Sequence, residues 1–160
     1  MLRSSPGLVR LIVMVTLVTS ACAPRPGGPP GDANLLFKDD FAKTDSGWDK
    51  YTGAEGTVDY AEGQYLIKVD KPNIYLWGTP GLNLTDSILE VDATYAAGPV
   101  NNEFGVICRL AENGDQKSFY FFFISSDGYY ATGKVVKNKK TFLGAPGAQS
   151  SAAIPRFDRP

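Results

Sequence analysis

The segment 103–143 constrains the fold of this chain more than any other part of the sequence. It holds three runs of strand-forming residues, separated by Asn113-Gly114 and Asp127-Gly128, and a fourth run follows Asn138. Asn-Gly and Asp-Gly are favoured in tight hairpins because these residues tolerate positive φ. The spacing therefore predicts an antiparallel meander.

One run within this meander, Phe119–Ile124, is apolar on both faces. We expect such a strand to be covered on both sides, since an exposed one would promote aggregation. From Leu35 onward the hydrophobic pattern has a period of two, and no segment shows helical periodicity. Further strands are predicted at Thr57–Tyr60, Gln64–Val69, Ile74–Trp77 and Ser87–Tyr95. Short strands separated by turns predict an all-β fold, either an antiparallel two-sheet sandwich or a barrel.

Composition excludes several chemistries. The 160 residues contain no histidine, which excludes Ser-His-Asp and Cys-His catalysis and any imidazole metal site. The formal net charge is −1, and no basic run interleaves with aromatic residues, so we expect no nucleic-acid partner. Strand alternation places Val106, Cys108 and Leu110 on one face, which predicts a buried thiol at Cys108.

The N-terminal residues show a different pattern. A basic start, an apolar stretch at Leu11–Val18 and the small residues Thr19-Ser20-Ala21 precede Cys22. The apolar stretch is far shorter than the roughly 20 residues that cross a bilayer as a helix. This order is typical of an export signal that is cleaved before the cysteine. A secretory signal beside an unrelated cysteine and a retained transmembrane helix are the alternatives.

The segment around Cys22 resembles the bacterial lipoprotein signal, which implies that Cys22 carries lipid. We therefore divide the chain into a lipoprotein signal peptide (1–21), a Pro/Gly-rich tether (22–34), a β-sandwich domain (35–143) and a low-complexity tail (144–160). No strand is predicted in the tail, and we expect it to be disordered. The protein is expected to be extracytoplasmic and anchored to a bacterial membrane through the lipid.

Several short motifs occur within residues 35–143. They are Asp39-Asp40-Phe41, Ser46-Gly47-Trp48, Glu62-Gly63-Gln64-Tyr65, the segment 104–109 and the segment 125–130. These motifs resemble concanavalin-A-like lectin/glucanase domains, in particular those related to the 3-keto-disaccharide hydrolase domain. The resemblance implies an antiparallel jelly-roll sandwich. Domains of this family usually continue through further strands, so we expect a sandwich that is incomplete at its C-terminus.

Some glucanases of this superfamily carry Glu-x-Asp-x-x-Glu on one strand. Here Glu90 and Asp92 match the first two carboxylates, but Tyr95 stands at the place of the last glutamate. Retaining hydrolysis needs two carboxyl groups about 5–5.5 Å apart on either side of the scissile bond. We therefore expect a non-catalytic domain, and a glycoside-acting enzyme using Glu90 and Asp92 is the alternative.

A carbohydrate or another cell-envelope ligand is the expected binding partner. Trp48 and Trp77 are the candidates for stacking on sugar rings, with core packing as the alternative for each. Polar candidates for the ligand's hydroxyl groups are Glu90, Asp92 and Arg109, and for Arg109 the alternative is a cross-strand ion pair. We expect no cofactor; calcium is an alternative, with Asp39, Asp40 and Asp127 as oxygen ligands. A further alternative is an interaction module whose open sheet edge accepts a partner strand.

Overall fold

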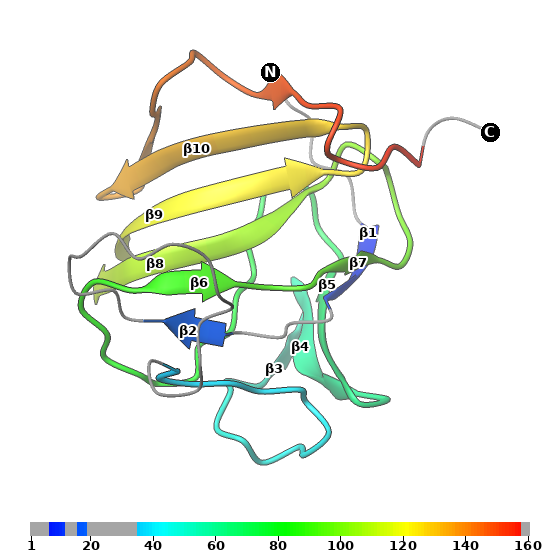
Figure 1. Ribbon diagram of the computed structural model, residues 1–160, viewed down its shortest axis with the longest axis vertical. Coiled ribbons are helices and arrows are strands. Elements are labelled where there is room, and N and C mark those ends of the chain that lie inside the picture. Colours follow the sequence, from blue (N-terminus) through cyan, green and yellow to red (C-terminus); the bar gives the residue numbers. More distant parts are fainter. Residues whose placement is uncertain (1–6, 12–15, 19–34, 158–160) are drawn as a thin grey trace, which may run out of the picture. The chain divides into compact units, whose positions relative to one another are not determined.

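The computed structural model describes residues 7–11, 16–18 and 35–157 (Figure 1). The predicted lipid-bearing residue, Cys22, lies outside these ranges. The described residues form strands, turns and coil without any helix, which confirms the all-β prediction. No helix in this part of the chain is long and apolar enough to cross a membrane.

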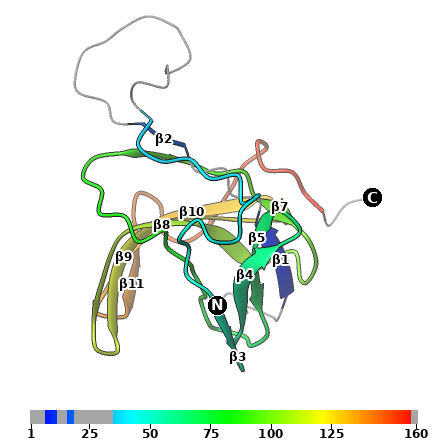
Figure 2. The same cartoon turned by 90° about the horizontal axis from the view of Figure 1, so that it is seen from below.

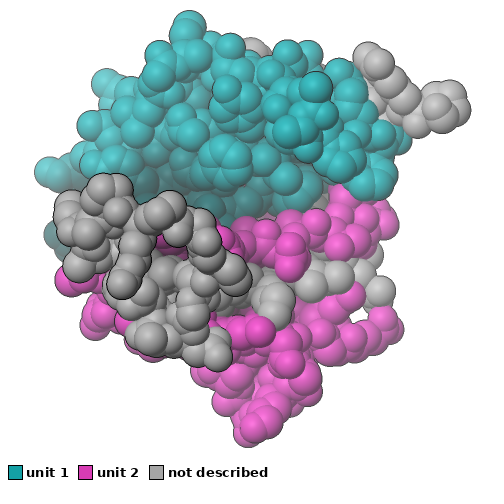
Figure 3. Space-filling model, in the orientation of Figure 1, with its two compact units in different colours: residues 1–5, 98–160 teal, residues 6–97 magenta. Residues whose placement is uncertain are grey.

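The chain divides into two compact units (Figure 3). Residues 6–97 form the N-terminal unit, and residues 98–160 with 1–5 form the C-terminal unit. Each unit has its own hydrophobic core and its own antiparallel pairing of strands. The two units are therefore described one at a time.

The C-terminal unit is built on the predicted meander. Its strands are β8 (Glu103–Asn113), β9 (Gln116–Ser125), β10 (Tyr129–Val136) and β11 (Lys139–Phe142), and they lie in the order β11-β10-β9-β8. The turn between β10 and β11 consists of Lys137 and Asn138, which both have positive φ, 50° and 67°. Two consecutive positive φ values match the twist of a tight hairpin. The meander prediction is confirmed.

The prediction of a buried thiol at Cys108 is wrong, since the Cys108 side chain is exposed. Strand β8 has a register irregularity between Cys108 and Ala111, and Arg109 has a φ of 54°. A bulge adds a residue to one strand and bends it, and β8 and β9 curve strongly (Figure 2). Ile107 contacts the core before the bulge, so Cys108 lies on the other face of β8; the bulge then brings Leu110, three residues after Ile107, to the core as well.

The N-terminal unit holds a five-stranded sheet with the order β3-β4-β5-β1-β7 and a two-stranded sheet of β2 and β6. The first comprises β3 (Tyr51–Gly53), β4 (Gly56–Ala61), β5 (Gln64–Val69), β1 (Gly7–Leu11) and β7 (Thr94–Tyr95); the second comprises β2 (Thr16–Val18) and β6 (Ile88–Glu90). The predicted β4–β5 hairpin is confirmed. Its turn residues, Glu62 and Gly63, have φ values of 54° and 71°.

Two predicted strands of this unit are wrong. Ile74–Trp77 forms no strand. The expected strand at Ser87–Tyr95 is divided, because β6 pairs with β2 whereas β7 pairs with β1, and 91–93 belong to neither strand. A strand persists only where a neighbour completes its hydrogen bonds. The alternation itself was predicted correctly, since Leu89, Val91 and Ala93 pack against the core.

Aromatic side chains dominate both cores. Phe41, Tyr60 and Tyr65, with Val58, form the buried cluster of the N-terminal unit. Phe119, Phe121 and Phe123 of β9, with Ala131 and Val135 of β10, form that of the C-terminal unit.

The expectation that Phe119–Ile124 is covered on both sides is wrong for its second face. The alternate residues Tyr120 and Phe122 are 44% and 45% exposed. An alternation of buried and exposed rings means that the described parts of the chain cover one face of β9 and leave the other open to solvent.

The tail after residue 143 contains a strand that the sequence did not predict. Strand β12 (Gln149–Ser150) pairs with the start of β10. Backbone hydrogen bonds of 2.9 Å join Ser151 N–H to Gly128 C=O and Phe157 N–H to Ser126 C=O. The segment has few apolar residues, so its pairing depends on backbone bonds that composition does not indicate.

Candidate functional site

The open face of the β8–β9–β10 sheet is the candidate site. Register places side chains of these three strands in rows across this face. The rows are Phe104, Ile124 and Tyr130; Val106, Phe122 and Thr132; and Cys108, Tyr120 and Lys134. We call these nine residues the outer aromatic face.

The rings on this face are accessible and close together. The ring centroids of Phe122 and Tyr130 are 6.2 Å apart, and their planes are inclined by 32°. Tyr120 lies two residues before Phe122 on β9, at a spacing of about 6.8 Å, since a strand rises about 3.4 Å per residue. Neighbouring exposed rings of this kind are a feature of ligand and partner contact sites, which makes this face a candidate.

Hydrogen-bonding groups accompany the rings. The phenol groups of Tyr120 and Tyr130 can donate and accept, and the ammonium group of Lys134 can donate. The Thr132 hydroxyl donates to the Leu143 carbonyl oxygen at 3.0 Å, so its oxygen keeps lone pairs for another donor. Flat apolar rings with polar groups between them suit a ligand that has both apolar and hydroxylated surfaces.

Trp48, a predicted stacking residue, is part of the N-terminal core. Its ring lies 5.3 Å from Phe41 and 5.1 Å from Tyr65, between centroids. Its indole Nε1–H donates to Asp39 Oδ2 at 3.0 Å. Trp48 therefore packs in the core, which the sequence left open as the alternative to stacking on a sugar ring.

The carboxylate of Asp39 organises the loop that carries Trp48. It is 7% exposed. Its Oδ1 accepts from the backbone N–H of Phe41 at 2.8 Å, and its Oδ2 also accepts from the Ser46 hydroxyl. Phe41 has a φ of 57°, an unusual backbone conformation for an aromatic residue that this carboxylate holds in place. Asp39 therefore serves the fold of the loop.

The remaining predicted site residues lie at separate places. Trp77 is half-buried in the coil after β5. Glu90 ends β6 opposite Thr16, and Asp92 follows the strand; both carboxylates are exposed. Arg109 is exposed in the β8 bulge of the other unit. Within each unit, the described geometry does not gather these residues into one site.

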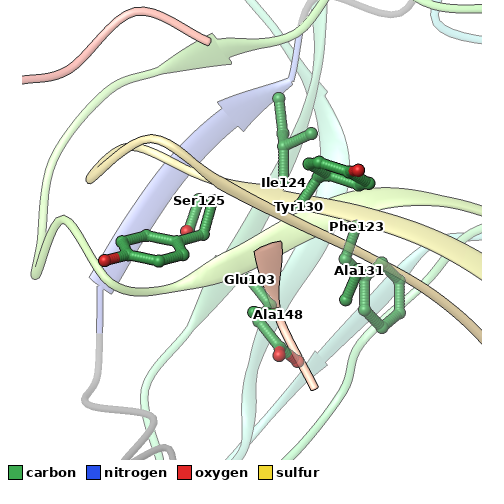
Figure 4. A pocket seen from close by; sticks show the side chains of 8 residues that line it. Glu103, Phe123, Ile124, Ser125, Tyr130, Ala131 and Ala148 are labelled. Carbon is green, nitrogen blue, oxygen red and sulfur yellow. The ribbon is translucent and has the colours of Figure 1, made fainter. Parts of the chain in front are cut away.

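A small cavity lies beside the sheet of the C-terminal unit (Figure 4). Its lining residues are Glu103, Phe123, Ile124, Ser125, Tyr129, Tyr130, Ala131 and Ala148. Its volume of about 10 Å³ corresponds to one water molecule. Glu103 pairs with the Lys140 ammonium at 3.1 Å. The cavity is far too small for a sugar ring.

The aspartates considered for calcium make local hydrogen bonds. Asp40 Oδ1 accepts from the backbone N–H of Ala42 at 3.0 Å, and Asp127 Oδ1 accepts from the Ser125 hydroxyl at 2.5 Å. Among the residues that the structure describes, no group of three or more histidine, cysteine, aspartate or glutamate side chains could hold a metal ion.

Comparison with known proteins identifies no relative: no family model, no curated protein and no solved structure matches the chain. Sequence reasoning missed the outer aromatic face because it assumed a cover for both faces of Phe119–Ile124. The signal was present in the sequence, since Tyr120 and Phe122 alternate with the three buried phenylalanines. Only the surroundings of the strand reveal which set is exposed.

Proposed function

We propose that the protein is a lipid-anchored, extracytoplasmic module that binds carbohydrate without hydrolysing it. In this proposal its sheets belong to a jelly-roll sandwich, and the ligand is a polysaccharide of the cell envelope or of the surroundings. The observation that carries the proposal is the outer aromatic face, in which Tyr120 and Phe122 are exposed on β9 and the half-buried Tyr130 lies beside Phe122 on β10.

The chemistry of this face suits a sugar chain. A pyranose presents C–H groups on its faces and hydroxyl groups around its edge. Exposed rings gain favourable apolar contact with the C–H faces. Thr132, which pairs with Phe122, Lys134, which pairs with Tyr120, and the two phenol groups can bond the hydroxyl groups, directly or through water. Because the two exposed rings, Tyr120 and Phe122, are spaced along β9, a linear chain that reaches both fits better than a single compact ligand.

Binding assays with the two central rings test this proposal. Purified protein is titrated with a panel of soluble bacterial and plant polysaccharides by isothermal calorimetry. Removing a stacked ring forfeits about 1.5–3 kcal/mol of apolar burial. Phe122→Ala or Tyr120→Ala should therefore weaken binding about tenfold or more.

Tyr75→Ala is the matched control for these substitutions. Tyr75 is 43% exposed and belongs to the N-terminal unit. Its variant should bind like the wild type. The proposal fails if no polysaccharide binds, or if Phe122→Ala and Tyr75→Ala have equal affinities.

Glycoside hydrolysis by Glu90 and Asp92 has less support. β6 ends at Glu90, and both carboxylates are exposed. General acids in glycosidases have a raised pKa, which an apolar enclosure provides. Chromogenic glycosides would detect an activity, and hydrolysis that disappears in Glu90→Gln would favour this alternative over simple binding.

The anchor is supported by the order of residues before Cys22. One acyl chain binds a membrane only marginally, whereas two or more give stable anchoring. Wild-type protein from cells should partition into the detergent phase, and Cys22→Ala should move to the aqueous phase. Equal partitioning of the two proteins would contradict the lipid anchor.

A further inference from the structure

The five-stranded sheet of the N-terminal unit contains a strand from the proposed signal peptide. β1 (Gly7–Leu11) lies between β5 and β7 (Figure 1). It pairs antiparallel with β5 over five positions, from Gly7↔Val69 to Leu11↔Tyr65. On its other side Val9 pairs with Tyr95 and Arg10 with Thr94. Backbone hydrogen-bonding groups on both sides of this position are thus directed toward one inserted strand.

Cleavage before Cys22 would remove β1 from this position. One edge of β5 would then present a row of unpaired N–H and C=O groups. β7 would lose β1, its neighbour in the described sheet. Two facing strand edges with a gap of one strand between them form a specific acceptor for an extended peptide.

We propose that this gap between β5 and β7 is, in the processed protein, a binding site for an extended segment of another polypeptide. The inference rests on the processing step of the proposed function. It adds a protein partner to the carbohydrate ligand, and it concerns a different unit from the outer aromatic face.

The register defines the chemistry of the partner segment. Directly paired residues of neighbouring strands lie on the same face of the sheet. Positions opposite Tyr65, Ile67 and Val69 therefore share the face that includes the fully buried Tyr65, and they require apolar or small side chains. Positions opposite Leu66 and Lys68 share the other face, where polar side chains fit, since the Lys68 side chain is 43% exposed.

The partner segment is thus a strand of about five residues with apolar side chains at alternate positions, antiparallel to β5. A row of unpaired backbone groups selects a polypeptide over a sugar or a lipid, because only a polypeptide supplies donors and acceptors at the strand repeat. Residues 7–11 show by their pairing the register that such a segment would adopt.

A peptide-binding experiment tests the inference. The protein is purified from membranes in detergent, and its intact mass defines the N-terminus and any lipid on Cys22. A fluorescent peptide with the sequence of residues 6–12 is then titrated and followed by anisotropy. The control peptide carries Val9→Pro, which removes a ladder donor and fixes φ. We expect the control to bind about tenfold or more weakly.

Amide hydrogen exchange locates the bound peptide. Addition of the peptide should slow exchange at every second residue of β5, those whose N–H groups point away from β4, and in Thr94–Tyr95. Three results would overturn the inference. They are retention of residues 1–21 in the exported protein, equal binding of the two peptides, and protection confined to other strands. The first also contradicts the proposed anchor, whereas the other two leave the anchor and the carbohydrate proposal standing.

Discussion

The buried carboxylate of Asp39 offers the sharpest test of how the N-terminal unit is held together. It accepts hydrogen bonds from the Phe41 backbone, the Ser46 hydroxyl and the Trp48 indole. Asp39→Ala removes all three acceptors at once. Ser46 keeps another contact, since its hydroxyl lies 3.0 Å from the Tyr60 hydroxyl. For the Phe41 N–H and the Trp48 Nε1–H, the described residues offer Asp39 as the acceptor.

The cost of Asp39→Ala follows from these two donors. Each buried donor left without an acceptor costs about 1–3 kcal/mol, and bonds to a charged group lie at the upper end. We therefore expect the free energy of unfolding to fall by about 4 kcal/mol. That is a large part of the roughly 5–15 kcal/mol of a typical domain.

Asp39→Asn gives a finer test of the same carboxylate. The amide oxygen can replace Oδ1 and keep the Phe41 bond, but the amide NH₂ group then faces the Trp48 Nε1–H. We expect a loss of about 2 kcal/mol. In a Trp48→Phe background this donor conflict is absent, so the same Asn substitution should cost about 1–2 kcal/mol less than in the wild type.

Denaturant unfolding followed by tryptophan fluorescence measures these effects. The two tryptophans of the chain, Trp48 and Trp77, both belong to the N-terminal unit, so the signal reports this unit. Trp77 remains as the reporter in Trp48→Phe. Asp40→Asn is the control, because Asp40 is exposed and accepts only a local bond from Ala42 among its described contacts. A loss below about 1 kcal/mol for Asp39→Ala, or zero coupling with Trp48, would refute this account.

Two further predictions concern the β4–β5 hairpin. Gly56 has a φ of +147°, and an added Cβ would lie 2.0 Å from the Lys68 carbonyl oxygen. Gly56→Ala should therefore lower the free energy of unfolding of the N-terminal unit by about 3 kcal/mol. Gly47→Ala is the control, because Gly47 has a φ of +98° and nothing lies within 4 Å of the added Cβ. It should lower the free energy of unfolding by about 1–2 kcal/mol. Equal losses for the two variants in thermal unfolding would contradict the clash at Gly56. Burial, followed by the charge of Asp49, raises the pKa of the Tyr65 phenol above its usual value. Since the unfolded chain ionises first, the free energy of unfolding should fall as pH rises above about 10, and Tyr65→Phe should flatten this fall in denaturation curves measured from pH 8 to 11.

The local elements of this fold could be predicted from the sequence. The hairpin turns at Glu62-Gly63, Gly114 and Lys137-Asn138 have positive φ, and the preference of glycine and asparagine for this conformation acts within a few positions. The inward face of Leu89, Val91 and Ala93 follows from alternation alone. Such features need no knowledge of distant neighbours.

The errors arose where a distant neighbour decides the outcome. The bulge at Arg109 brings both Ile107 and Leu110 to the core although they are three residues apart, and Cys108 lies exposed on the other face; the uninterrupted alternation of the sequence does not indicate this change of phase. Trp48 and Phe122 show the same limit in opposite directions. Asp39 and Tyr65 hold the tryptophan in a core, whereas no described neighbour buries the phenylalanine to the same extent. Residue type alone left both environments open for Trp48 and predicted the wrong one for Phe122.

The sequence of residues 7–18 fits both an export signal and sheet strands, because both require apolar residues. An export signal needs an apolar stretch, and a central strand needs apolar and β-branched residues. The aromatic cluster of the N-terminal unit does not depend on that choice in its described contacts. Phe41, Trp48, Tyr60 and Tyr65 pack against one another and against residues between 37 and 93. Loss of β1 would remove backbone pairing from β5 and open the strand edge that a strand-binding site requires, whereas these described ring contacts join residues outside β1.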